Sequence, residues 1–335
     1  SDAAARAHHL VDNHTGRQQA ANGGNARMIN MDESRDFIGY GQDIPKISWP
    51  GDARVAVSLC LNYEEGAERS VLDGDPRNEW VGEISYTPSR PQERDLSQES
   101  VYEYGSRAGV WRLLRLFDRT AVPVTVYASA RALQRNPAAA RAFVQAGHEV
   151  CSHGLRWQEP TELSEEEERA EIAEAVRIIT ELCGQRPVGW YSRYSGSPRT
   201  RRLLVEHGGF RYDSNAYNDD LPYWAGEPSR PHLVIPYTHT YNDGRFTFSP
   251  GYGSPQDFFD NVRRGIEYLW EEGETSPKMI SVGLHARVIG QAGRASALRD
   301  LIEWAKELPG VWFARRCDIA DWWYQNYPMT EGGQA

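Results

Sequence analysis

This chain of 335 residues lacks several features, and each absence excludes a class of protein. No apolar stretch approaches the ~20 residues that a membrane-spanning helix needs. Only four cysteines are present, at positions 60, 151, 183 and 317, without paired spacing, so we expect reduced thiols and a cytoplasmic protein. Positive charge is in deficit, with 37 Lys and Arg against 47 Asp and Glu. The resulting net charge of -10 argues against nucleic acid or an anionic membrane as a partner.

Length and composition favour one large domain. Apolar residues make up 40% of the chain and aromatic residues 11%, which is ample for a single core. No Gly/Ser/Pro-rich linker and no internal repeat divides the interior, so we expect one domain over residues 31–335. Residues 1–30 carry hardly any apolar pattern and contain His8, His9 and His14. We expect a tail or leader without a catalytic part, whose histidines can bind metal adventitiously.

The most informative feature is an apolar run, residues 54–61, that leads into two adjacent carboxylates and a glycine, Glu64, Glu65 and Gly66. The run is typical of a buried strand, and in α/β folds the rim at the carboxyl ends of strands carries the chemistry. Side chains alternate along an extended segment, so only one of the two carboxylates can point into the central cavity. We predict that it is Glu65. The alternative is a solvated acidic loop.

Two more strand-like runs end in a histidine: residues 147–152 lead to His153, and residues 278–284 lead to His285. A lone histidine is more often a packed, hydrogen-bonded core residue than a catalyst. Two histidines and a carboxylate, each at the same end of a different strand, are harder to explain by packing. They supply a base, an acid and a group that holds charge on a substrate oxygen, which is the set that water-mediated hydrolysis needs.

Strand and helix signals alternate along the rest of the chain. A capping box of Ser164 and Glu167 opens a helix that Gly184 closes. Other predicted helices cover residues 110–117 and, as the last one, 298–308. Further predicted strands are residues 123–127, 187–191, 210–213, 232–237, 279–285 and 311–314. We therefore predict an α/β fold, a distorted (β/α) barrel of about seven or eight mostly parallel strands.

The order of these motifs resembles the polysaccharide-deacetylase-like superfamily (carbohydrate esterase family 4, with its NodB-homology fold), and within it the cofactor-independent allantoinase branch. The resemblance extends from about Arg35 to Trp323 and includes residues 36–41, 103–111, 184–191 and 219–224. It implies the barrel fold, hydrolysis of a C–N bond and a homo-oligomer.

A metal ligand of the superfamily pattern is missing. The resemblance implies a divalent metal held by an acidic strand-end residue and two histidines four positions apart. Here His153 is followed at that spacing by Trp157, and an indole cannot bind a cation. Glu65 and His153 alone would make a poor metal site, so we expect no required metal or other cofactor. Trp157 either packs in the core or forms a wall against a planar substrate.

Without a metal, side chains must activate water and hold the developing charge. We predict Glu65 as the general base, with His153 orienting it or sharing the proton, and His285 as donor to the departing nitrogen. Arg193 and Arg287 are candidate donors to the substrate, although an exposed structural role is as plausible for each. Candidate aromatic walls, for which core packing competes, are Trp190, Tyr191, Tyr223 and Trp224.

Three segments depart from the allantoinase pattern: Ser192–Arg193, residues 158–161 and residues 290–294. All are expected in rim loops, where a substrate is selected. We therefore predict a hydrolase that acts on a small cyclic amide or ureide, with allantoin as the first substrate to test. The alternatives are a polysaccharide or N-acetyl deacetylase, a cyclic imide hydrolase and, more remotely, a non-catalytic binding protein.

Overall fold

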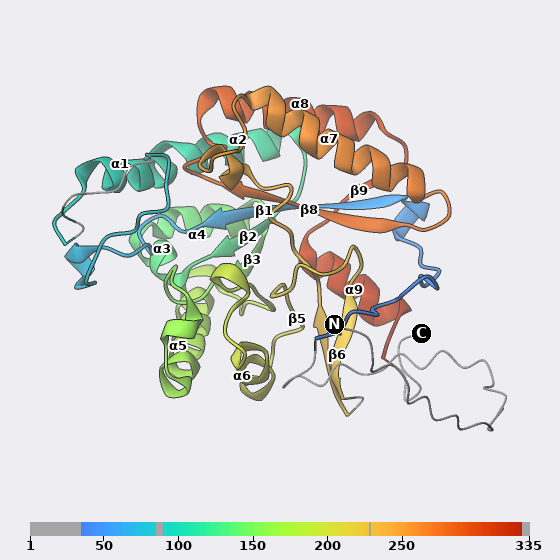
Figure 1. Cartoon of the computed structure of the whole chain (residues 1–335), viewed down its shortest axis with the longest axis horizontal. Coiled ribbons are helices and arrows are strands. Elements are labelled where there is room, and N and C mark those ends of the chain that lie inside the picture. Colours follow the sequence, from blue (N-terminus) through green and yellow to red (C-terminus); the bar gives the residue numbers. More distant parts are fainter. Residues whose placement is uncertain (1–34, 85–89, 91, 228, 330–335) are drawn as a thin grey trace, which may run out of the picture.

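A curled and mostly parallel sheet forms the centre of the molecule, and helices pack around it (Figure 1). The computed structural model describes residues 35–84, 90, 92–227 and 229–329, so the predicted tail at 1–30 lies outside the described residues. The strands are β1 (Val55–Tyr63), β2 (Thr125–Ala128), β3 (Glu149–Ser152), β4 (Gly189–Trp190), β5 (Tyr212–Asp213), β6 (Tyr223–Glu227), β7 (Arg230–Val234), β8 (Lys278–His285) and β9 (Val311–Phe313).

The strand order is β6-β7-β5-β4-β3-β2-β1-β8, and β9 pairs with the first residues of β1. Every described pair is parallel except β6 with β7. β8 is at one end of this order and β7 is next to the other end, and the two strands do not pair. The sheet therefore does not close into a complete barrel and is open between β7 and β8. The predicted distorted barrel is confirmed, as a half-barrel.

The opening is filled by side chains and by the segment that follows β7. Asn242 in this segment forms a single parallel bridge with Gly283 of β8. The fully buried Arg316 donates hydrogen bonds to Ser281 Oγ of β8 and to the carbonyl oxygen of Pro236 after β7. The gap is therefore held by a buried guanidinium rather than by a strand pair.

The described helices are α1 (Leu96–Tyr104), α2 (Val110–Thr120), α3 (Ala130–Arg135), α4 (Pro137–Gln145), α5 (Glu165–Cys183), α6 (Thr200–His207), α7 (Pro255–Glu272), α8 (Ala292–Glu307) and α9 (Arg316–Asn326). A π-helical turn, Gly105–Gly109, joins α1 to α2. The capping box at Ser164 and the left-handed Gly184 are confirmed at the two ends of α5. The prediction that residues 298–308 form the last helix was wrong, because α9 follows; its buried face contains Arg316, which interrupts the apolar pattern.

The two faces of β1 meet different cores. One face packs under the helices through its odd-numbered residues: Val55, Val57, Leu59, Leu61 and Tyr63. The other face points into the barrel and includes Ala56 and Cys60. Alternation continues past the end of the strand, so Asn62 and Glu64 belong to the interior face.

The cysteines agree with the prediction of reduced thiols: all four are free, and three of them, Cys60, Cys151 and Cys183, are buried. Across the described part of the chain, every helix is too short or too polar to cross a bilayer.

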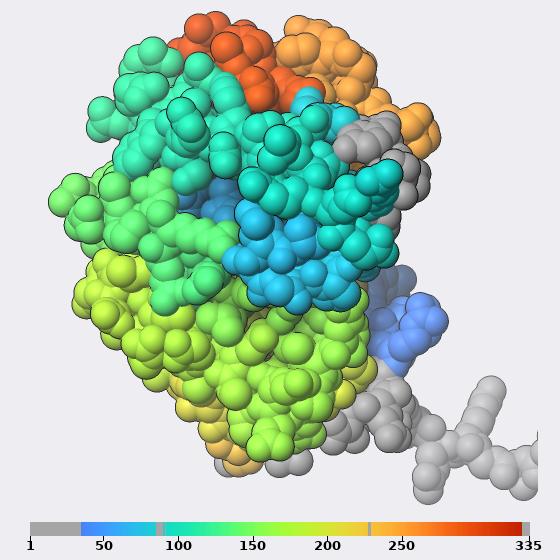
Figure 2. Space-filling view, turned by 90° about the vertical axis from the view of Figure 1, so that its left-hand side faces the viewer, coloured from blue at the N-terminus to red at the C-terminus, as the bar shows by residue number. Residues whose placement is uncertain are grey.

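The carboxyl end of β1 points to the left in Figure 1, and Figure 2 looks onto that face of the molecule. The segment that follows β1, coloured cyan-blue, lies in the middle of the face between teal residues above and yellow-green residues below. Val81 and Gly82 of this segment line the pocket described next. The segment after β1 therefore forms part of the wall of the candidate site.

Candidate active site

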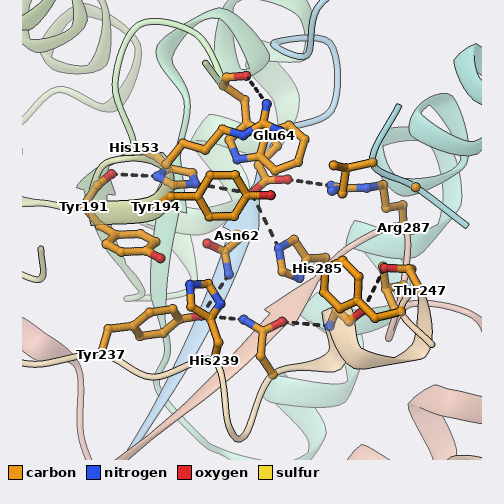
Figure 3. A pocket seen from close by; sticks show the side chains of 18 residues that line it. Asn62, Glu64, His153, Tyr191, Tyr194, Tyr237, His239, Thr247, His285 and Arg287 are labelled. Carbon is orange, nitrogen blue, oxygen red and sulfur yellow. Dashed lines mark hydrogen bonds and ion pairs between the residues drawn. The ribbon is translucent and has the colours of Figure 1, made fainter. Parts of the chain in front are cut away.

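A cavity of about 60 Å³ lies at the carboxyl ends of the central strands (Figure 3). Seven of the eleven side chains predicted from the sequence line it: Glu64, His153, Trp157, Tyr191, Arg193, His285 and Arg287. They come from strand ends and loops that are far apart in the sequence, which supports the prediction that the rim of the barrel carries the site.

Glu64 is at the centre of the site. Its Oε1 lies 3.3 Å from His153 Nε2 and 3.5 Å from His285 Nε2. Its Oε2 lies 2.8 Å from Nη1 of Arg287. Burial acts against the charged form, but Arg287 and His285 outweigh it and hold the pKa of Glu64 well below its ordinary value. Glu64 is therefore a buried carboxylate between two imidazoles.

His153 is held in one orientation. Its Nδ1 lies 2.6 Å from the backbone oxygen of Tyr191, and its ring stacks on the Tyr191 ring at 5.0 Å between centroids. A carbonyl oxygen can only accept, so Nδ1 carries a hydrogen and Nε2 faces Glu64. This arrangement places the second nitrogen of the imidazole where it can exchange a proton with the carboxylate or with a water beside it.

His285 has a second carboxylate partner, Asp243, which the sequence analysis missed. Asp243 Oδ1 lies 2.6 Å from His285 Nδ1, while Oδ2 accepts hydrogen bonds from the backbone N–H groups of His285 and Ile289. Burial opposes the charged form, but Asp243 and Glu64 outweigh it and raise the pKa of His285 to about 9. His285 is thus an imidazolium at neutral pH and can give a proton away.

Arg287 supplies a buried cation, with a side chain that is 4% exposed. Its guanidinium lies 4.3 Å from the ring centroid of Tyr102 and 5.2 Å from that of Trp157. Its Nε and Nη1 atoms have no aligned hydrogen-bond acceptor among the described residues, although Nη1 contacts Glu64 as an ion pair. Buried donors without a partner are rare, and a substrate oxygen would satisfy them.

Glu65 does not line the pocket, so the prediction that it points into the cavity was wrong. Its Oε2 accepts from the backbone N–H of Glu64 and its Oε1 from that of Arg287, at 3.0 and 3.1 Å. Gly105 of the π-helical turn packs directly against this carboxylate, where any Cβ would overlap it. Because side chains alternate along the strand, Glu64 points into the cavity and Glu65 points away from it. Glu65 instead binds the backbone of Arg287 and helps to position it.

Arg193 lines the pocket but is already engaged. It forms an ion pair with Glu79 at 2.7 Å and donates to the backbone oxygen of Trp157 at 3.0 Å. Its guanidinium stacks over the Trp157 ring at 3.7 Å from the centroid. Trp157 consequently both packs against its neighbours and forms a wall of the cavity, while Arg193 holds that wall in place.

Three predicted aromatic walls lie elsewhere. Trp190 does not line the pocket; its Nε1 donates to Ser192 Oγ, and its ring packs on Phe210. Tyr223 and Trp224 belong to β6 at the edge of the sheet and line a separate hollow with residues 36–41. The prediction was wrong for Tyr223 and Trp224 because β6 is an antiparallel addition to the sheet and does not reach the rim around Glu64. It was wrong for Trp190 because this side chain, at the end of β4, packs against Phe210 instead.

The pocket also contains side chains that were not predicted, among them Asn62, Tyr194, Tyr237, His239 and Asn242. A signal existed for Asn62, which is a polar residue in an apolar strand, two positions before Glu64 and on the same face. The segment 237–243 follows β7 and fills the barrel opening, and it carries no strand-end pattern that would have indicated a site.

The side chains present do not fit the divalent metal of the superfamily pattern. Among the described residues, no group of three or more His, Cys, Asp or Glu side chains is arranged to hold a metal ion. Arg287 lies against one oxygen of Glu64, and Asp243 holds Nδ1 of His285. The position four after His153 is the indole of Trp157, which has no lone pair for a cation.

Fold and site together define a half-barrel protein with a buried carboxylate, two histidines and a guanidinium gathered at its strand ends. A family model described as polysaccharide deacetylase matches residues 97–212. A Schizosaccharomyces pombe protein whose name places it among the polysaccharide deacetylases is 38% identical over 319 residues, covering 89% of this chain and 99% of that protein. The chain belongs to the polysaccharide deacetylase family, which is a family of hydrolases, and the predicted resemblance is confirmed.

Two solved structures are similar over the same part of the chain. The crystal structure of Puue allantoinase is 50% identical with a TM-score of 0.86, covering 89% of this chain and all of that chain. A Pseudomonas aeruginosa PAO1 structure, also named for polysaccharide deacetylases, is 52% identical with the same TM-score and the same coverage. The names of similar proteins therefore point to two different substrates.

Proposed function

We propose that this protein hydrolyses a C–N bond in a small cyclic amide or ureide by acid–base catalysis with its own side chains, allantoin being the first substrate to test. The observation that carries the proposal is the position of Glu64, with one oxygen between His153 Nε2 and His285 Nε2 and the other on Arg287. These groups supply the proton acceptor, the proton donor and the cation that such a hydrolysis needs.

In the proposed reaction, a water held by the Glu64–His153 pair attacks the carbonyl carbon and gives its proton to that pair. The tetrahedral oxyanion accepts hydrogen bonds from Arg287, whose Nε has no acceptor among the described side chains and backbone. His285, kept protonated by Asp243, gives its proton to the nitrogen as the C–N bond breaks. The products are a carboxylate and a free amine or urea nitrogen.

The size and walls of the cavity support a small, flat substrate. The cavity is about 60 Å³, and Trp157, Tyr191 and Tyr194 are among its walls. A flat ring that stacks on aromatic side chains suits such a space better than a polymer chain. The similarity to an allantoinase, at 50% identity over 89% of this chain, adds to this argument.

N-deacetylation is the second candidate, because the names of other relatives favour it. It shares the same bond type, since an acetamide is also an amide. It differs in the substrate, which would carry an acyclic acetyl group on a sugar and would need room for neighbouring sugars. Arg193 is held in the pocket wall by its ion pair with Glu79, and the cavity is small. Both features argue against space for neighbouring sugars.

A substrate panel separates the two. Protein without residues 1–30 should be assayed with allantoin, hydantoin, dihydrouracil, succinimide and N-acetylglucosamine oligomers, with and without chelator. We expect hydrolysis of at least one cyclic amide or ureide, and loss of that activity in Glu64→Gln. Turnover of the N-acetyl sugars alone would overturn the proposal in favour of deacetylation.

A further inference from the structure

We infer that Tyr237 is a further catalytic residue, whose hydroxyl group donates a hydrogen bond to the carbonyl oxygen of the substrate as negative charge develops there. This inference rests on the proposed function and assigns to that site a donor which the sequence analysis did not identify.

The hydroxyl oxygen of Tyr237 is already an acceptor twice. It accepts from Nδ2 of Asn62 at 3.4 Å and from Nδ2 of Asn242 at 3.1 Å. Figure 3 shows Asn62 next to Tyr237 in the wall of the pocket. A phenol oxygen accepts at most two hydrogen bonds, and these two amides supply both of them.

The orientation of both amides is fixed by backbone groups. Asn62 Nδ2 also donates to the carbonyl oxygen of Leu284 at 3.1 Å, and a reversed amide would place two acceptors together. Asn242 Oδ1 accepts from the backbone N–H of Gly244 at 2.7 Å, and a reversed amide would place two donors together. Neither amide can therefore turn its oxygen toward Tyr237 and receive the phenol hydrogen.

The hydrogen of Tyr237 is consequently left to donate elsewhere. Within the part of the chain that the structure describes, it has no acceptor, and the side chain is buried and lines the pocket. Burial raises the pKa of Tyr237 well above its ordinary value, so the phenol carries its proton at neutral pH. A neutral buried donor without an acceptor, in the wall of the cavity, is suited to an incoming carbonyl oxygen.

The ring of Tyr237 is held rigidly. It packs on Tyr191 at 4.8 Å and edge-on to Tyr127 at 5.5 Å between ring centroids, and His239 meets it edge-on at 5.9 Å. Donors that are fixed before the reaction stabilise a transition state most, because no reorganisation is needed when charge develops.

The step balances without any added reactant. Water adds to the carbonyl carbon, and the electron pair of the C=O bond moves to the oxygen, where Tyr237 and Arg287 donate hydrogen bonds. Collapse of this oxyanion restores the C=O bond and breaks the C–N bond, with the proton on nitrogen coming from His285. Tyr237 keeps its proton throughout.

The test compares Tyr237→Phe with Tyr127→Phe on the best substrate of the panel. Both variants remove one buried hydroxyl from the same aromatic group, but Tyr127 does not line the pocket. We expect Tyr237→Phe to lower kcat by roughly 10²–10³-fold, with KM nearly unchanged. Tyr127→Phe should keep kcat within about threefold, since it removes no donor from the site.

A second readout uses a cyclic phosphonamidate analogue of the same substrate, which presents a tetrahedral anion. Its inhibition constant should rise in Tyr237→Phe by the same factor by which kcat falls, while the affinity for the planar substrate is unchanged. A merely structural role would weaken both alike. Circular dichroism and Tm confirm that both variants fold.

Each outcome decides the matter. If the unmodified protein hydrolyses the substrate and Tyr237→Phe retains kcat within threefold, or loses it no more than Tyr127→Phe, the inference is overturned and the proposed function stands. If the unmodified protein hydrolyses no member of the panel, the proposed function falls and this inference falls with it.

Discussion

Nη1 of Arg287 lies 2.8 Å from Oε2 of Glu64, in a site where both side chains are almost completely buried. Removing either partner would leave an uncompensated charge in the interior, which is strongly unfavourable. The backbone N–H groups of these same two residues bind the carboxylate of Glu65. A guanidinium is thus fixed beside the central carboxylate, and it provides positive charge without any exchangeable ion.

The first prediction concerns metal. Thorough chelation should leave turnover of the best substrate essentially unchanged, because Arg287 provides the cation and the donor set does not fit a divalent metal. The measurement is kcat/KM before and after dialysis against a chelator, on protein lacking residues 1–30 with their histidines. Loss of most activity, restored by zinc, would sink this idea.

The variant Trp157→His sharpens the same test. It restores the missing histidine of the superfamily pattern, yet two arginines, Arg193 and Arg287, lie against that ring. We expect Trp157→His to bind zinc no more tightly than the unmodified protein in a calorimetric titration. Tight stoichiometric binding of zinc would contradict this expectation, because it would show that zinc readily displaces Arg287 from Glu64.

The second prediction separates the two adjacent carboxylates. Glu64→Gln should lower kcat by roughly 10²–10⁴-fold, because it removes the acceptor between the two imidazoles. Glu65→Gln keeps the shape and acts only through Arg287, so we expect a smaller loss, about tenfold, with Glu65→Asp recovering part of it. Steady-state kinetics of both variants on one substrate show which substitution lowers kcat more. A larger loss in Glu65→Gln than in Glu64→Gln contradicts the assignment of Glu64 as the central carboxylate.

The sequence of β1 itself indicates which of the two carboxylates faces the cavity. Leu59, Leu61 and Tyr63 form the helix-facing side, so the opposite side continues through Asn62 to Glu64. A buried asparagine in a mostly apolar strand is costly unless it is hydrogen-bonded, and here it donates to the phenol oxygen of Tyr237 and to a backbone carbonyl of β8. The buried amide was therefore the local sign of which carboxylate faces the cavity.

Asp243 and Tyr237 could not have been found in this way. The strand ends that carry Glu64, His153 and His285 are set by local hydrophobic pattern, which the sequence displays directly. Asp243 reaches His285 across 42 positions only because β7 and β8 fail to pair and the chain between them enters the opening. That failure depends on tertiary packing around Arg316, for which no short stretch of sequence carries a signal.

The third prediction concerns pH. His285 has a pKa raised to about 9, so the proton donor is present below that pH, and activity should fall as the pH rises through about 9. Asp243→Asn removes a carboxylate that raises this pKa, so the alkaline limb of kcat/KM should move to lower pH by roughly one unit or more. Asp213→Asn is the control, because Asp213 binds His232 outside the pocket. A limb that does not move would exclude His285 as the acid.

The same shift affects stability. A histidine whose pKa is raised by folding contributes stability that is complete below its unfolded value of 6.5 and is lost as the pH rises through about 9. Between pH 6.5 and about pH 9, the Tm of the unmodified protein should therefore fall by more than the Tm of Asp243→Asn. Thermal unfolding at intervals across this window measures the difference, and parallel curves would contradict it.

The last prediction concerns the mouth of the cavity, where Tyr194 lines the pocket from a left-handed backbone conformation, φ 52 and ψ 45. Such a conformation is unfavourable for any residue with a Cβ, and its retention at a pocket indicates a use for the side chain. Tyr194 is 47% exposed, so little core packing is lost when its ring is removed. We expect Tyr194→Gly to be more stable than Tyr194→Ala by roughly 0.5–1 kcal/mol in denaturant unfolding, because only glycine relieves the strain.

Both variants should raise KM for a cyclic substrate by about tenfold while changing kcat little, because the ring contacts a bound molecule and takes no part in proton transfer. Equal stability of the two variants would show that the backbone is not strained, and an unchanged KM would show that the ring serves no ligand.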